Sequence, residues 1–140
     1  MPRIKLPRPK RVDFYTNIVL RVYDMNYGGH MGNDSVLSIA HEARVQFLKS
    51  FKMTERDFYG SSLLMADSAV VYKKEAFYGD ELQICISVSE FYNYGFELLY
   101  LIKDLHSNLE VARVKTGLVC YNHNDNKMVS LSPVFIKKFS

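Results

Sequence analysis

Two kinds of hydrophobic pattern divide this chain of 140 residues. From Asn33 or Asp34 onward, apolar side chains recur every three or four residues, which predicts an amphipathic helix of about four to five turns. Its apolar stripe consists of Val36, Ala40, Ala43, Phe47 and Phe51. Asn33 or Asp34 is expected to be the N-cap, because a short polar side chain can accept a hydrogen bond from the first turn.

Most of the rest of the chain is rich in β-branched and aromatic residues, which predicts strands. The first is expected in "DFYTNIVLRVYD", before the helix. The later ones are expected in "SLLMADSAVVYKKEAFY", "DELQICISVSEFYN", "FELLYLIKDLH", "LEVARVKTGLVCYNH" and "KMVSLSPVFIKKF". Short breaks rich in Gly, Asn and Ser separate most of them, so neighbouring strands are expected to form an antiparallel meander.

One long helix and five or six strands leave few ways to bury the apolar stripe. A strongly twisted antiparallel sheet can wrap around the helix, which gives the α+β architecture known as the hotdog fold. The length of the chain suits one such domain, residues 13–140, after an arm of residues 1–12. In a single copy the sheet edge and the rim of the helix N-terminus would stay unsatisfied, so we expect a homodimer or homotetramer.

Charge changes the picture only in the arm. Five basic residues precede the first acidic one, whereas the remaining chain has 13 basic and 15 acidic residues. A basic tail broken by prolines on a near-neutral body is typical of a solvated arm or an edge clamp, and no groove-binding helix follows it. We therefore expect no nucleic-acid partner. No apolar run has the ~20 residues of a membrane span, so we expect a cytoplasmic protein without a membrane partner.

Candidate chemistry is concentrated in "YDMNYGGHMGND", between the first strand and the helix. Gly28, Gly29 and Gly32 allow the backbone to approach a ligand just before the free N–H groups of the helix start. Such N–H groups can stabilise a negatively charged oxygen. The alternative is that the glycines only form the turn and that Asn33 or Asp34 only caps the helix.

The order Asp24, Asn26, Gly29, His30, Asn33, followed by "HEAR" and "YGDEL", resembles the loop of the hotdog-fold acyl-CoA thioesterases of the 4-hydroxybenzoyl-CoA thioesterase type. In that family the loop usually runs Asp-x-Asp-x-x-Gly-His-x-x-Asn. The resemblance implies hydrolysis of an acyl-CoA, or less readily an acyl-ACP, without cofactor or metal. It also implies an oxyanion hole at the N–H of Asn33 or Asp34 and a substrate-binding role for Gly29.

The chain departs from this family at Asn26, where a catalytic Asp is usual, because an amide cannot act as a base at neutral pH. Asp24, with Asn26 and His30, resembles a set found in acyl-ACP thioesterases. Glu42 resembles the helix glutamate of a second branch of hotdog thioesterases, and Glu75 resembles the distal glutamate of the acyl-ACP enzymes. We expect Asp24 or Glu42 to be the base or nucleophile, with Asn26 and His30 positioning water and carbonyl.

Several alternatives stay open. Glu42 points away from the apolar stripe, so it is also compatible with an ordinary solvated face. Arg44 lies within the apolar arc, and a buried guanidinium requires a carboxylate partner, for which Asp24 and Asp67 are candidates. A hotdog enoyl-thioester hydratase, or a module that binds acyl-CoA or acyl-ACP without turnover, would also fit the loop, and Asn26 favours the latter.

Overall fold

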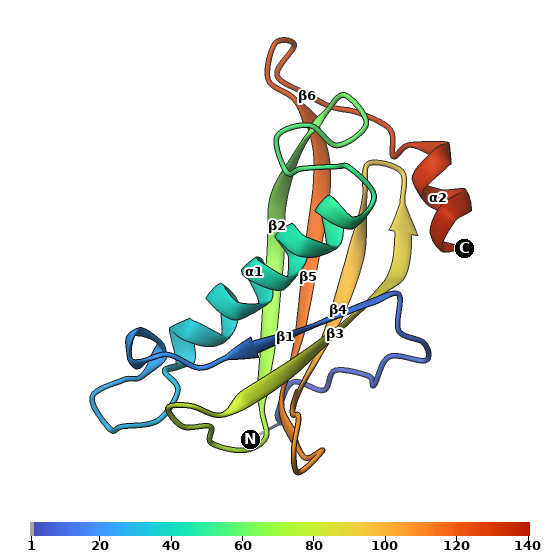
Figure 1. Cartoon of the computed structure of the whole chain (residues 1–140). Coiled ribbons are helices and arrows are strands. Elements are labelled where there is room, and N and C mark those ends of the chain that lie inside the picture. The colour runs from blue at the N-terminus through green and yellow to red at the C-terminus, as the bar shows by residue number, and fades with distance from the viewer. Residues whose placement is uncertain (1) are drawn as a thin grey trace.

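A computed structural model describes residues 2–140 and has one sheet and two helices. The elements are β1 (Phe14–Val19), the 3₁₀ helix η1 (Val22–Asp24), α1 (Asn33–Ser50), β2 (Ser62–Tyr72), β3 (Glu81–Tyr92), β4 (Gly95–Asp104), β5 (Glu110–Asn122), β6 (Lys127–Met128) and α2 (Pro133–Phe139). The sheet order is β1-β3-β4-β5-β2, with β6 beside β5, and all pairings are antiparallel. Because α1 lies across one face of this twisted sheet (Figure 1), the predicted α+β hotdog fold is confirmed.

The apolar stripe of α1 packs on the inner face of the sheet, as expected. Its buried apolar residues are Val36, Ile39, Ala40, Ala43, Phe47 and Leu48. They meet alternate residues of the central strands, such as Ile84, Leu98 and Val114, which are all 0% exposed. This alternation follows from the two-residue period of a strand, which sends successive side chains to opposite faces.

The predicted N-cap of α1 is wrong by one residue. The helix begins at Asn33, and the cap is Gly32, which has no side chain to accept a hydrogen bond. The N–H of Gly32 donates to the carbonyl of Asp24 at 3.0 Å, so the preceding loop fixes the cap position. A Cβ at Gly32 would lie 2.7 Å from Oδ1 of Asp34, so a larger residue there would require the exposed Asp34 side chain to move.

Arg44 is 3% exposed and lies between α1 and the sheet. Its Nε donates to Oε1 of Glu55 at 3.0 Å, and its Nη1 donates to the hydroxyl of Tyr100 at 3.1 Å. That hydroxyl also shares a hydrogen bond of 2.7 Å with Oγ1 of Thr116. The expected partners of Arg44, Asp24 and Asp67, are therefore wrong, because the guanidinium points to the sheet beneath the middle of the helix.

Asp67 instead accepts hydrogen bonds from β5 at a bulge in β2. The register between β2 and β5 shifts between Met65 and Asp67. Oδ1 of Asp67 accepts hydrogen bonds from the N–H of Gly117 at 3.1 Å and from Nζ of Lys115 at 2.7 Å. A Cβ on Gly117 would lie only 2.5 Å from that oxygen, so these hydrogen bonds require glycine opposite the bulge.

The two ends of the fold differ from the predicted strands. The last segment forms only the short β6 and then α2, because Ser132 caps a helix that has Pro at its first position. Phe135 and Phe139, four residues apart, are the buried residues of α2. The first strand ends at Val19, and η1 follows it. Within residues 2–140, no helix combines the length and apolar character needed to cross a bilayer.

The basic arm lies over the outer face of the sheet, opposite α1. Nη1 of Arg113 donates to the carbonyl of Leu6 at 3.0 Å, and Arg11 forms an ion pair of 3.0 Å with Asp13. Figure 1 shows the arm, in dark blue, running from the lower part of β5 to the start of β1.

We expect Tyr100→Phe to lower the free energy of unfolding by about 1–3 kcal/mol, because Arg44 and Thr116 would lose a buried partner. Urea denaturation would measure the change. Tyr15→Phe is the matched control, since Tyr15 is 61% exposed. Equal stability of the two variants would contradict a structural role for the hydroxyl.

Candidate active site

The loop between η1 and α1 is held by Asn26. Its Oδ1 accepts hydrogen bonds from the N–H of Gly28 at 2.9 Å and of His30 at 3.4 Å, and its own N–H donates to the carbonyl of His30 at 2.8 Å. Gly29 has a φ of +83°, which favours glycine. Asn26 and Gly29 thus shape the loop, and the loop decides where the ring of His30 lies.

The ring of His30 is oriented by its own backbone neighbour. Nδ1 lies 3.2 Å from the carbonyl oxygen of Met31. A carbonyl can only accept, so this hydrogen bond requires the proton on Nδ1 and leaves Nε2 as an acceptor. Nε2 lies 3.9 Å from Oε1 of Glu75, on the segment that follows β2. The loop and this segment are joined because the N–H of Met31 donates to the carbonyl of Ala76 at 2.7 Å.

His30 opens into a depression of about 310 Å³ beside the N-terminus of α1. Its lining combines the helix start, the end of β2 and the segment after it: His30, Met31, Asn33, Val36, Tyr72, Lys73, Lys74, Glu75, Ala76 and Val111. The hydroxyl of Tyr72 donates to the carbonyl of Asn33 at 3.3 Å, which ties the strand to the helix start. Because the cap is glycine, no side chain caps the first N–H groups of α1 in the described chain.

Asp24 lies on the other side of the loop, and its carboxylate is already hydrogen-bonded. Its Oδ2 accepts hydrogen bonds from the backbone N–H of Arg21 at 2.9 Å and from Nε of Arg21 at 3.3 Å. Burial alone would raise the pKa of Asp24, but the hydrogen bonds and charge of Arg21 outweigh it and lower that pKa. Asp24 is therefore a stable carboxylate that closes its own turn. Arg21 was not among the predicted site residues, although its i,i+3 spacing from Asp24 is typical of such a pair.

Glu42 shares a second depression, of about 400 Å³, with Asp24. It accepts a hydrogen bond of 2.7 Å from Nε2 of Gln46, and Gln46 in turn accepts one from the hydroxyl of Thr16. Glu42 follows Asn33 by nine residues, so it lies about 13 Å further along the helix axis.

The predicted site residues therefore fall into three groups. His30 and Asn33 line one depression, Asp24 and Glu42 line another, and Asn26 and Gly29 shape the loop between them. Oδ1 of Asp34 lies close to the cap residue. Among the residues that line the depression of His30, Glu75 alone carries a carboxylate.

Comparison with known proteins shows the family of the chain. A family model described as the thioesterase-like superfamily matches residues 20–139. The chain belongs to the thioesterase-like superfamily. The match includes the whole loop, α1 and all strands from β2 onward, so the resemblance of the loop to thioesterases is confirmed at the level of the family.

Solved structures share the fold of this thioesterase-like chain at low sequence identity. A 1,4-dihydroxy-2-naphthoyl-CoA thioesterase from Synechocystis is 20% identical, with a TM-score of 0.82 over 90% of this chain and 94% of its own. A hypothetical protein from Aquifex aeolicus is 19% identical, with a TM-score of 0.81 over 91% and 99%. A DHNA-CoA thioesterase from Staphylococcus aureus is 18% identical, with a TM-score of 0.79 over 89% and 87%. No curated protein sequence matches the chain.

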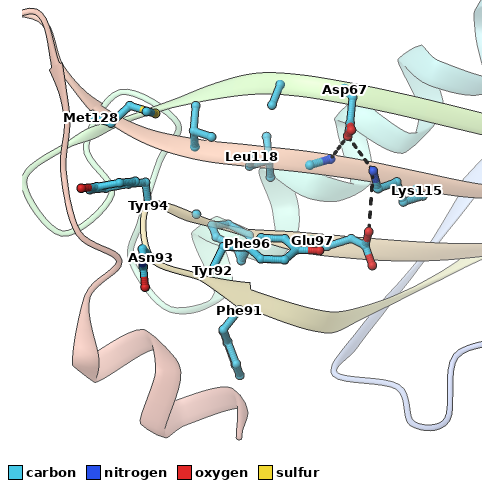
Figure 2. Close-up of a pocket in the computed structure, with 14 residues that line it drawn as sticks. Asp67, Phe91, Tyr92, Asn93, Tyr94, Phe96, Glu97, Lys115, Leu118 and Met128 are labelled. Carbon is cyan, nitrogen blue, oxygen red and sulfur yellow. Dashed lines mark hydrogen bonds and ion pairs between the residues drawn. The ribbon is translucent and has the colours of Figure 1, made fainter.

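A larger hollow, of about 720 Å³, lies on the outer face of this thioesterase-like domain. Figure 2 shows Lys115 between the carboxylates of Asp67 and Glu97, whereas Tyr94 lies at the other end of the hollow, near Met128. Its acids are thus paired with a cation, and its lining includes neither the loop nor α1.

The lowered pKa of Asp24 predicts a pH-dependent effect on stability. A carboxyl with a lowered pKa in the folded state stabilises the fold above its unfolded pKa of about 3.9, and this contribution disappears as the pH falls through the folded value. Asp24→Asn should therefore lower the melting temperature at neutral pH, and the difference should vanish in strong acid. Thermal melts across pH would show it. Asp125→Asn, at an exposed turn, is the control and should have no such profile.

Proposed function

We propose that the protein hydrolyses an acyl-CoA thioester to the free acid and CoA. The observation that carries the proposal is the shared depression of His30 and the uncapped start of α1, described above. A free imidazole nitrogen and free backbone N–H groups at one place are what hydrolysis of a thioester requires.

In the proposed reaction, water attacks the thioester carbonyl and transfers a proton to Nε2 of His30. The N–H groups of Asn33 and Asp34 stabilise the oxyanion that forms. When the tetrahedral intermediate collapses, the C–S bond breaks, and the thiolate of CoA takes the proton from His30. Glu75, at 3.9 Å, would stabilise the transient imidazolium.

Two lysines support CoA as the carrier of the acyl group. Lys73 and Lys74 line the depression directly after β2, and the backbone N–H of each donates to the carbonyl of Val111, which holds this segment in place. Ammonium groups beside the site can bind the phosphates of CoA. The neighbours from Synechocystis and Staphylococcus aureus are both named as thioesterases of a CoA thioester.

The two carboxylates expected to act as the base differ in how each is held. Asp24 is held by Arg21, which argues against a free base. Glu42 is exposed and bonded to Gln46 alone among the described residues, but it lies too far along α1 to serve the helix start of its own chain. A role for Glu42 would require a partner subunit that brings its helix to this depression.

Thiol release from a panel of acyl-CoA substrates tests the proposal. The natural chain should release thiol, and His30→Ala should lower kcat by roughly 10²–10⁴, the usual contribution of a general base. His106→Ala is the matched control, since the side chain of His106 is 77% exposed and does not line the depression of His30. If His30→Ala kept full activity and Glu42→Gln lost it, the base would be Glu42 on α1 instead.

Asn26 favours one alternative, a module that binds acyl-CoA without turnover, because it replaces the acid usual at that position. Asn26→Asp distinguishes the two functions, since a carboxylate can accept the same two backbone hydrogen bonds. A binder that lost its acid should gain thiol release with this change. A working enzyme should lose activity, because an added charge would lie near His30. A hotdog hydratase would instead consume an enoyl-CoA without releasing thiol.

A homodimer is part of the proposal. β2 is an edge strand of 11 residues. Apolar side chains are exposed beside it and on the adjoining surface of α1: Leu37, Val45, Met65 and Tyr72, at 38%, 44%, 45% and 51%. An unpaired edge with an apolar margin is a surface that proteins usually cover.

We therefore expect a sedimenting mass of at least twice the 16.2 kDa of the chain. Met65→Lys should shift it to the monomer, because a charged side chain on an edge strand blocks pairing. Met128→Lys, at a site of similar exposure on β6, should leave it unchanged. An active natural monomer would contradict the shared-edge assembly.

A further inference from the structure

The depression of His30 has a buried apolar floor and an exposed charged rim. Its floor consists of Met31, Val36, Ala76 and Val111, which are 7%, 1%, 2% and 1% exposed. Its charged lining residues, Lys73, Lys74 and Glu75, are all exposed. A thioester that reacts at His30 would therefore place its acyl group on the floor and its CoA portion along the rim, because apolar surface favours the acyl group.

The floor is closed toward the core. Ala40 follows Val36 by one helical turn and is 0% exposed, and Val114 on β5 is 0% exposed as well. A side chain without exposed surface adjoins no space that holds a water molecule. An acyl chain therefore cannot extend between α1 and the sheet at these two residues unless packed core side chains move, which is costly.

Tyr72 bounds the depression toward the middle of α1. It is the last residue of the edge strand β2, and its hydroxyl donates to the carbonyl of Asn33 at 3.3 Å, so its side chain spans from the sheet to the first turn of the helix. Leu37 follows Asn33 by one helical turn on the same side of α1. Leu37 is 38% exposed and does not line the depression. The ring of Tyr72 therefore separates the depression from the exposed apolar surface of Leu37.

We infer that the acyl group of the substrate is short and aliphatic, and that Tyr72 sets this limit by closing the path toward Leu37. The inference rests on the proposed function, since it concerns the acyl group of the same thioester. The depression of about 310 Å³ must also hold the thioester and the adjoining part of CoA. Ligand pockets usually measure roughly 300–1,000 Å³, so little of this space remains for the acyl group. A longer chain would meet either the closed floor or the ring of Tyr72.

The experiment compares butyryl-CoA with octanoyl-CoA as substrates of the full chain. The measured quantity is the ratio of kcat/KM for octanoyl-CoA to kcat/KM for butyryl-CoA, from thiol release. A general loss of folding or assembly lowers both values and leaves their ratio unchanged. The natural chain should favour butyryl-CoA. A natural chain that favoured octanoyl-CoA or 2-naphthoyl-CoA would overturn the inference.

Tyr72→Ala should raise this ratio at least about tenfold, because the longer chain can then reach Leu37. Tyr72→Phe keeps the ring and should keep the natural ratio. Tyr92→Ala is the matched control, since Tyr92 is also the last residue of its strand, is 55% exposed compared with 51% for Tyr72, and does not line the depression. An unchanged ratio in Tyr72→Ala, or an equal rise in Tyr72→Phe, would overturn the ring of Tyr72 as the limit.

A second substitution tests the path of the longer chain. Leu37→Gln, added to Tyr72→Ala, should cancel most of the gain with octanoyl-CoA, because the chain would lose its apolar surface on α1. The same gain with and without Leu37→Gln would overturn this path.

Binding without turnover separates this inference from the proposed hydrolysis. Isothermal titration calorimetry on the His30→Ala chain should give a lower Kd for butyryl-CoA than for octanoyl-CoA, and Tyr72→Ala in that chain should remove the difference. Absence of thiol release from the natural chain, with this difference in Kd intact, would contradict the hydrolysis alone. An equal or lower Kd for octanoyl-CoA in the His30→Ala chain would overturn the limit on the acyl group.

Discussion

The buried guanidinium of Arg44 sets the position of α1 on the sheet. A charge at that depth must keep its partners, and these come from different parts of the chain: Glu55 before β2 and Tyr100 on β4. The rotation of α1 is therefore fixed. That rotation turns Leu37 and Val45 outward beside the edge strand, directs Glu42 toward β1, and places the uncapped helix start against the end of β2.

Much of this architecture was predictable, because it rests on periodicity. The three- and four-residue spacing from Val36 to Phe47 belongs to a helix with one buried side, and that side is the one observed. The turns after β2 contain the residues that turns require, and the meander β3-β4-β5 follows from them. The loop residues were predicted as a group because a cluster of glycines directly before a helix start is a recognisable sequence signal.

The predictions were wrong where a contact with a distant part of the chain determines the local structure. Arg44 clearly needed an acceptor, but a phenol 56 residues away was not readable from the chain. The last segment has strand-like composition, yet the cap at Ser132 and the aromatic cluster of Phe135 and Phe139 make it a helix. Asp24 and His30 are six residues apart and lie in different depressions, because the loop between them turns back on Asn26.

The bulge in β2 links two positions that are 50 residues apart. The carboxylate of Asp67 fills the space that a side chain at position 117 would need, and it supplies the acceptor that the interrupted ladder lacks. If a larger residue replaced Gly117, Asp67 would have to move away and the N–H opposite the bulge would lose its partner. If a small apolar residue replaced Asp67, the space would open but the acceptor would be gone. Related chains that keep this bulge should therefore vary the two positions together, so that the pair serves as a marker of the edge strand's geometry in sequences whose structures are unknown.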